Sequence, residues 1–109
     1  METKFVKIVT TVPKTHADVV RQAMGDAGAG ILGNYTNCSI SSDIIGRFKP
    51  VAGANPFIGA VGVLESVIEE KIEVTCERSK IKTVCNTVKQ VHPYEEVVFD
   101  IYPLEDLNF

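Results

Sequence analysis

The chain has 109 residues, of which 45% are hydrophobic, which is enough for one ordinary core, so we expect a single domain over residues 1–109. The net charge of −3 and the scattering of the 11 lysines and arginines argue against nucleic acid as a partner. No apolar run approaches the length of a membrane span, and the amino terminus lacks the pattern of a signal peptide, so we expect a cytoplasmic protein.

The first third of the chain predicts a strand followed by a helix. Residues 4–12, KFVKIVTTV, are rich in β-branched side chains and predict the strand. Residues 15–28 show helical spacing, with Thr15 and Asp18 as an expected capping box and Gly28 as an expected left-handed end. The inward face of this helix is predicted to contain Val19, Val20, Ala23, Met24 and Ala27.

The middle of the chain predicts two short strands and a long loop. Residues 34–41 alternate in polarity and predict a second strand. Residues 41–48, SSDIIGRF, are compatible with a turn and a short third strand that would complete a hairpin. Residues 49–62 are rich in glycine and proline, and a loop of this length is uncommon in a small domain unless it has a function.

The last third of the chain repeats the order of strand, helix and strand. Residues 66–77 alternate cleanly except for an expected irregularity near Glu70. Residues 79–91 predict a helix capped by Ser79, and residues 96–104 predict the last strand. The inward face of this second helix is predicted to contain Ile81, Val84, Cys85, Val88 and Val91.

The element order β-α-β-(β)-β-α-β predicts an α+β fold, a ferredoxin-like sandwich in which two helices cover one face of an antiparallel sheet. The other face of such a sheet stays open. We therefore expect self-association to cover it, as in a symmetric ring.

Two groups of residues invite a functional reading. Residues 28–33, GAGILG, match the dinucleotide-binding pattern G-x-G-x-x-G, but here a helix enters the turn and a strand leaves it. That order is the reverse of the one that places a helix amino terminus at a pyrophosphate, so we interpret the segment as a helix cap and connector. We expect Cys76 and Cys85 in the core, whereas Cys38 is a candidate ligand for a soft metal beside an imidazole.

The segment HPYEE, His92 to Glu96, combines an imidazole, a phenol and two carboxylates. His92 stands at a predicted helix end, where a donor satisfies the last carbonyls, and Pro93 prevents the helix from continuing. We expect Tyr94 to pack on the helix with its hydroxyl in water. Glu95 and Glu96 are successive residues of an extended segment, so they point to opposite sides and do not chelate one ion together. The pattern favours a structural corner, and a site here requires partners from elsewhere.

Four segments, AGAGILGNYTNCSIS, GRFKP, GANPFIGAVGVLE and HPYEEVVFDIYPL, occur in this order and resemble the YqfO-type domain. This domain is an insert between the two metal-binding halves of the dinuclear-metal-centre hexameric proteins, relatives of yeast NGG-interacting factor three. The resemblance covers residues 13–104 and implies a fold like that of CutA and PII proteins. The chain looks like a free-standing version of the insert, and the metal site of the two halves is not implied for it.

The tetrapeptide HPYE is also similar to the end of CutA proteins, which form trimers and are linked to divalent-metal tolerance and copper binding. The resemblance implies that His92, Tyr94 and Glu95 belong to a shared signature, and that Cys38 lies in the strand where CutA proteins carry a cysteine. It therefore implies His92, Glu95 and Cys38 as candidate ligands of a divalent metal such as copper.

We expect a non-enzymatic oligomer, a trimer, that binds a metal or a small ligand in a cleft between subunits. The loop 49–62 and the HPYEE corner would line this cleft, and backbone N–H groups at Gly53, Asn55 and Gly59 would approach the ligand as in an anion-binding nest. One alternative is a protein-interaction or regulatory module that docks on a larger partner. A further alternative is an enzyme with a site shared between subunits and His92 as general base.

Overall fold

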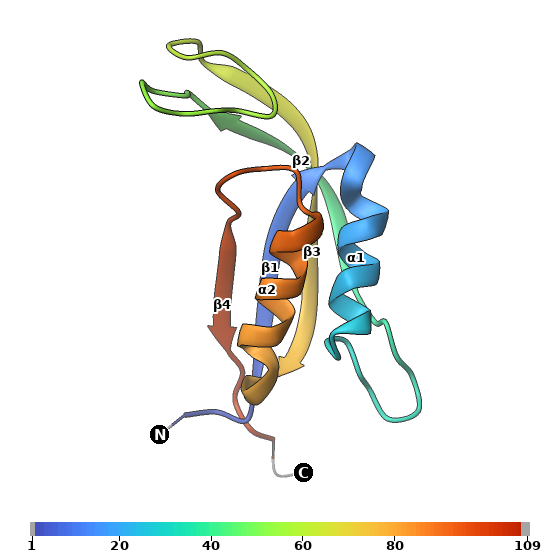
Figure 1. Ribbon diagram of the computed structural model, residues 1–109. Coiled ribbons are helices and arrows are strands. Elements are labelled where there is room, and N and C mark those ends of the chain that lie inside the picture. Colours follow the sequence, from blue (N-terminus) through green and yellow to red (C-terminus); the bar gives the residue numbers. More distant parts are fainter. Residues whose placement is uncertain (1, 108–109) are drawn as a thin grey trace.

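The computed structural model describes residues 2–107, which form one four-stranded sheet with two helices. The strands are β1 (Phe5–Pro13), β2 (Ile40–Phe48), β3 (Glu65–Glu77) and β4 (Phe99–Pro103), and the helices are α1 (Ala17–Asp26) and α2 (Ile81–Val91). All strand pairs are antiparallel in the order β2-β3-β1-β4, and both helices cover the same face (Figure 1). The predicted α+β, ferredoxin-like fold is confirmed. No helix within residues 2–107 is long and apolar enough to cross a membrane.

The core lies between the sheet and the two helices. Ile8 at the centre of β1 is fully buried and pairs with Val74 of β3 and Ile101 of β4. The inward face predicted for α2 is confirmed, because all five of its residues are buried or packed against the core. On α1, Val19 is 44% exposed, so its predicted place on the inward face is wrong. The buried residues of the core are Val6, Ile8, Val12, Ala17, Val20, Met24, Ala29, Ile72, Val74, Cys76, Val84 and Val88.

Neither helix begins with the side-chain cap that we predicted. Thr15 and Ser79 lie inside 3-10 turns, Lys14–His16 and Arg78–Lys80, that precede the helices and make no side-chain cap hydrogen bond. A carbonyl of each turn accepts the first backbone N–H of the helix instead. Asp18 binds an arginine one turn further along its own helix rather than closing a capping box. The 3-10 turn thus replaces the cap.

The end of α1 is as predicted. Gly28 has φ +99°, a left-handed conformation that favours glycine. Its N–H donates to the carbonyl of Gly25, and the N–H of Ala29 donates to that of Met24, both at 3.0 Å. These two bonds form a Schellman motif, so the GAGILG segment serves as a helix end and connector.

The strand predicted over residues 34–41 is wrong. The N–H of Cys38 donates to the carbonyl of Gly30 at 2.9 Å and closes this segment as a loop. Asn37 has φ +58°, which interrupts an extended run. The single strand β2 follows and replaces the hairpin that residues 41–48 were expected to complete.

The predicted irregularity in β3 is also wrong. The ladders from β3 to β1 and to β2 run without interruption past Glu70. Glu70 faces the helices because the alternation is regular, and its carboxylate binds the guanidinium of Arg21 on α1. The sequence pattern looked irregular because Glu70 is a charged residue at an inward-facing position, where Arg21 of α1 pairs with it.

The strands β2 and β3 extend beyond the rest of the sheet. Their pairing continues from Ile45 opposite Ile68 to Phe48 opposite Glu65, whereas β1 stops at Pro13 opposite Glu69. This two-stranded arm, residues 45–68, carries the long loop at its tip (Figure 1). The loop between α1 and β2 lies at the opposite end of the sheet. The arm therefore places the loop above the corner between α2 and β4.

Candidate ligand site

The HPYEE corner crosses a free edge of the sheet. Because β4 pairs with β1 only as far as Thr10, residues 11–13 of β1 have no strand partner on that side within residues 2–107. There His92, which is 7% exposed, donates from Nε2 to the carbonyl of Thr11 at 2.8 Å. Its Nδ1 accepts the backbone N–H of Tyr94 at 3.1 Å. His92 thus ends α2 and turns the chain, as predicted, but its side chain donates to β1 and not to the last carbonyls of the helix.

Both nitrogens of His92 are committed to these backbone groups. Burial lowers the pKa of His92, although the hydrogen bond to Thr11 and the charge of Glu69 act in the opposite direction. Protonation would place a second N–H on Nδ1, opposite the N–H of Tyr94. A role as general base or metal ligand would require His92 to break one of these bonds.

Tyr94 does not keep its hydroxyl in water as we predicted. The hydroxyl donates to Oε2 of Glu69 at 2.8 Å, and the ring lies 6.2 Å from that of Phe48. Burial, and then the hydrogen bond to Glu69, raise the pKa of Tyr94. The phenol therefore stays protonated and remains a donor.

Glu69 is a buried carboxylate on the face of the sheet that the helices leave uncovered. It is only 5% exposed. It points away from the helices because the next residue, Glu70, faces α1. A β-carbon at Gly46 on the neighbouring strand would collide with Oε1 of Glu69. Gly46 is therefore the residue that allows the carboxylate to lie against β2.

The loop 49–62 is joined to the corner within one chain. The N–H of Asn55 donates to Oε1 of Glu95 at 2.9 Å. A carboxylate of the chain itself thus takes the N–H of Asn55 in this structure, and the expected ligand contacts of Gly53, Asn55 and Gly59 stay predictions. Gly53 and Gly59 have φ +99° and +96°, which glycine alone adopts readily, but neither lines the cavity described next.

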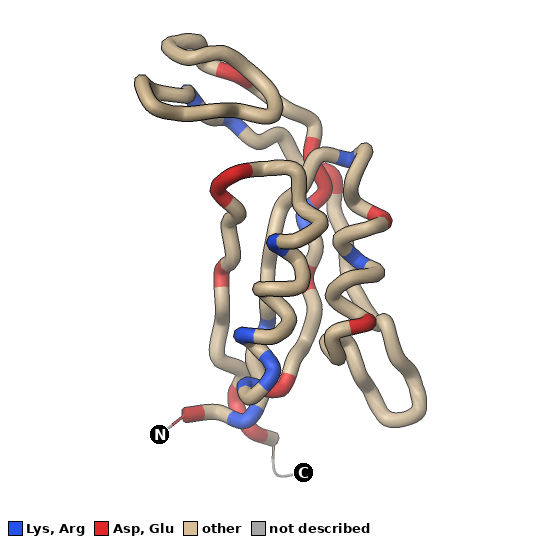
Figure 2. Tube along the Cα trace, viewed as in Figure 1, with Lys and Arg blue, Asp and Glu red and all other residues tan. Residues whose placement is uncertain are grey.

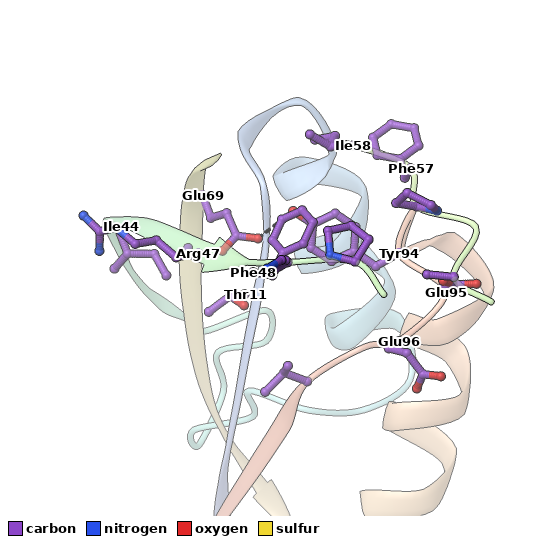
Figure 3. A pocket seen from close by; sticks show the side chains of 16 residues that line it. Thr11, Ile44, Arg47, Phe48, Phe57, Ile58, Glu69, Tyr94, Glu95 and Glu96 are labelled. Atoms are coloured by element: carbon purple, nitrogen blue, oxygen red, sulfur yellow. Dashed lines mark hydrogen bonds between the residues drawn. The ribbon is translucent and has the colours of Figure 1, made fainter. Parts of the chain in front are cut away.

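A cavity of about 470 Å³ lies between the arm, the loop and the corner (Figure 3). Three aromatic rings form much of its wall, three glutamates contribute acceptors, and two basic residues stand at its margin. These aromatic and charged lining residues are Phe48, Phe57, Tyr94, Glu69, Glu95, Glu96, Arg47 and Lys49. Thr11 and Gly46 belong to its floor, on the open face of the sheet.

The three predicted metal ligands do not meet within one chain. The backbone N–H of Cys38 donates to Gly30, whose own N–H donates to the carbonyl of Thr75 near the end of the sheet opposite the cavity. His92 and Glu95 lie at the cavity end. Within residues 2–107, no group of three or more histidines, cysteines, aspartates or glutamates could hold a metal ion.

Sequence reasoning missed Glu69 and its contact with Tyr94. The alternation of residues 66–77 put Glu69 on the face opposite the inward-facing apolar residues, but it gave no reason to expect that the Glu69 side chain is buried. Gly46 inside a strand was the available signal, because a glycine there marks the close approach of another group. The strand register was needed to identify that group.

The comparisons with known proteins agree with the sequence resemblance. No family model matches the chain. The chain is 50% identical over 99 residues to a "GTP cyclohydrolase 1 type 2 homolog" of Bacillus subtilis, covering 91% of this chain and 26% of that protein. It is 52% identical over 99 residues to the protein of the same name in Halalkalibacterium halodurans, covering 90% and 26%. The chain spans about a quarter of the length of these relatives.

Solved structures extend the likeness to the fold. A Bacillus cereus protein related to NIF3 matches 97% of this chain and 27% of its own length, with a TM-score of 0.83 and 42% identity. The periplasmic divalent cation tolerance protein CutA of Archaeoglobus fulgidus matches 95% of this chain and 87% of its own, with a TM-score of 0.70 and 19% identity. The chain is therefore homologous to one segment of NIF3-related proteins named GTP cyclohydrolase 1 type 2 homolog, and it has the fold of CutA.

Proposed function

We propose that this chain is a non-enzymatic, oligomeric binding protein of CutA/PII-like architecture, and that the cavity beneath the loop 49–62 takes a small ligand. The observation that supports this most is the hydrogen bond from Asn55 to Glu95, which joins two segments distant in sequence around one cavity. Aromatic walls with a few convergent polar groups are typical of small-molecule sites. His92, the best general base in the sequence, is committed to backbone hydrogen bonds.

We further propose that copies of the chain associate, as a trimer, and complete the open side of this cavity. Ile45 and Ile68 pair on the face of the arm that points away from the cavity, and they are 56% and 67% exposed. Val98 and Tyr102, next to the uncovered face, are also more than half exposed. Apolar surface of this extent on a small protein favours burial against a partner, and an equivalent surface on a second copy would suit a symmetric contact.

A divalent metal held by His92, Glu95 and Cys38 stays a prediction. It requires Cys38 to come from a second copy, and it requires His92 and Glu95 to release their present hydrogen bonds. A small organic ligand requires neither change. The cytoplasm remains the proposed compartment, in line with three free cysteines in the described residues.

A matched pair of loop variants tests the ligand site. Ala54 lines the cavity, whereas Ala52, two residues earlier in the same loop, is exposed and does not. Ala54→Trp fills the cavity, and Ala52→Trp adds the same side chain outside it. We expect compounds from a metabolite library to raise the Tm of the wild type and of Ala52→Trp but not of Ala54→Trp, as measured by scanning fluorimetry.

Two results would contradict the proposal. One is a library that stabilises none of the three proteins. The other is a compound that stabilises Ala54→Trp as much as the wild type, because that compound binds elsewhere.

The second candidate function is docking on a larger partner, and a specific observation favours it. The loop between α1 and β2 exposes Leu32 and Tyr35, which are 72% and 73% accessible, at the end of the sheet opposite the cavity. The relatives are more than three times as long as this chain, so they contain further surface on which such a loop could rest. Affinity capture with the wild type and with Leu32→Asp would detect this role, since only the wild type should retain a stoichiometric protein partner.

A further inference from the structure

The floor of the cavity contains a buried carboxylate that lacks a cationic partner. Glu69 is 5% exposed, and its recorded hydrogen bond within residues 2–107 comes from the neutral hydroxyl of Tyr94 to Oε2. Its neighbour Glu70 is similarly buried on the other face but binds the guanidinium of Arg21. A carboxylate accepts up to about four hydrogen bonds, and a buried one is costly unless it is paired.

The basic residues at the cavity do not supply this partner. Arg47 and Lys49 are exposed, and neither forms an ion pair with Glu69 among the described residues. Figure 3 shows the Arg47 side chain directed away from Glu69 and Tyr94. This direction follows from the alternation of β2, in which Gly46 and Phe48 face the cavity and Arg47 faces the opposite side.

Further acceptors line the opposite wall. Glu95 and Glu96 belong to the corner, where Figure 2 shows an acidic stretch between α2 and β4. Glu95 uses Oε1 to accept the N–H of Asn55 and keeps a second oxygen. Of these charged groups only Glu69, at the floor of the cavity, is buried, whereas Glu95, Glu96 and the two basic residues are exposed.

Aromatic rings stand beside these acceptors. The rings of Phe48 and Tyr94 are 6.2 Å apart and tilted by 59°, and Phe57 of the loop adds a third ring to the lining. Aromatic faces attract cations, most strongly where water is excluded, and they also hold a flat apolar body.

We propose that the ligand of this cavity is a small organic cation, an ammonium, amidinium or guanidinium group on a flat or apolar body. The charged end donates to Glu69, and the apolar body lies between Phe48, Phe57 and Tyr94. This assignment rests on the proposed function of the cavity as a ligand site and adds the chemical class of the ligand.

Three probes of nearly equal shape and different charge test the assignment. Benzamidine is a flat cation, benzamide is neutral, and benzoate is an anion. Each is titrated into the full chain and followed by amide chemical shifts. We expect saturable binding of benzamidine, with shifts at Gly46 and Tyr94, and affinities for benzamide and benzoate that are lower by about tenfold or more.

Two charge-removing variants separate the role of Glu69 from a general effect of charge. Glu69→Gln keeps an acceptor for Tyr94 and removes the charge, so the affinity for benzamidine should fall by about tenfold. Glu73→Gln removes a charge from the same face of β3 outside this cavity and should leave the affinity unchanged. If Glu69→Gln does not fold, Ala54→Trp replaces it, because it blocks the cavity without altering Glu69.

Benzoate that binds as tightly as benzamidine would overturn the assignment, and so would equal benzamidine affinity in Glu69→Gln and the wild type. A neutral or anionic compound that stabilises the wild type but not Ala54→Trp would contradict the assignment of the ligand as a cation. It would still support the cavity as a ligand site. The absence of binding by any probe or library compound would overturn both proposals.

Discussion

Two consecutive glutamates of β3 have different roles because successive side chains of a strand point to opposite faces of the sheet. Glu70 points toward the helices and forms an ion pair with Arg21, whereas Glu69 points to the uncovered face and accepts a hydrogen bond from Tyr94. The first carboxylate is neutralised by the fold. The second is stabilised by one neutral donor and lies at the floor of a cavity, which is why it becomes the centre of the proposed site.

The imidazole of His92 leads to a prediction about pH. Burial lowers its pKa, so the unfolded chain binds a proton more readily than the folded chain below the ordinary histidine value of about 6.5. The stability that neutral His92 contributes is present above that value and is lost as the pH falls through it. We expect the free energy of unfolding to decrease between about pH 7 and pH 5, as measured by urea denaturation.

The matched variant for this prediction is His92→Gln, which can still donate to Thr11 but does not titrate. Its unfolding free energy should depend less on pH over the same range. An unchanged slope would show that other groups, such as the carboxylates, cause the dependence and would contradict the role assigned to His92.

At the scale of elements, the ion pair between Arg21 and Glu70 joins α1 to β3. The Glu70 side chain is 10% exposed and that of Arg21 is 31% exposed, so the pair is partly screened. Arg21→Met leaves a buried carboxylate without its cation and should lower the free energy of unfolding by about 2 kcal/mol. Urea denaturation measures this loss, and adding Glu70→Met should restore most of it.

Arg47→Met is the control for this pair, since Arg47 is exposed and outside every recorded ion pair within the described residues. It should change the unfolding free energy by no more than about 0.5 kcal/mol. A double variant as unstable as Arg21→Met alone would show that the arginine acts by packing rather than by pairing.

The elements also show where sequence reasoning succeeds. Local patterns identified β1, β3, α2 and the end of α1, because alternation, helical spacing and a left-handed Gly28 act within a few residues. The strand predicted near Cys38 failed for a tertiary reason. The Asn37 side chain packs against Gly25 of α1, at a point where a β-carbon would collide with it, and the left-handed backbone there excludes a strand.

The candidate site was predictable in part. We expected the long loop and the HPYEE corner to line one cleft between subunits, and the bond between Asn55 and Glu95 brings them together within one chain. The hydrogen-bond partner of Tyr94 was not predictable from the sequence. Glu69 lies near Tyr94 because of the register of β3 with β1 and β2, which local patterns do not determine. The helix caps predicted at Thr15 and Ser79 were also wrong because both residues lie in 3-10 turns. The sequence near these residues does not distinguish a 3-10 turn from a capped helix start.

At the scale of the whole molecule, the two ends of the sheet differ. One end carries the arm, the cavity and the corner, and the other carries the apolar loop between α1 and β2 (Figure 1). With the arm included, the principal extents of the structure are 51 × 29 × 22 Å. A two-stranded arm has little core of its own. Contact with neighbouring copies would support the arm and close the cavity.

Native mass spectrometry of the freshly purified protein tests this account most directly, because it reports the assembly and any bound small molecule in one spectrum. We expect an oligomer, a trimer, that retains an organic ligand. We expect the same ligand in Ala52→Trp and none in Ala54→Trp. A bare monomer in the wild type, with no ligand at any concentration tested, would contradict it.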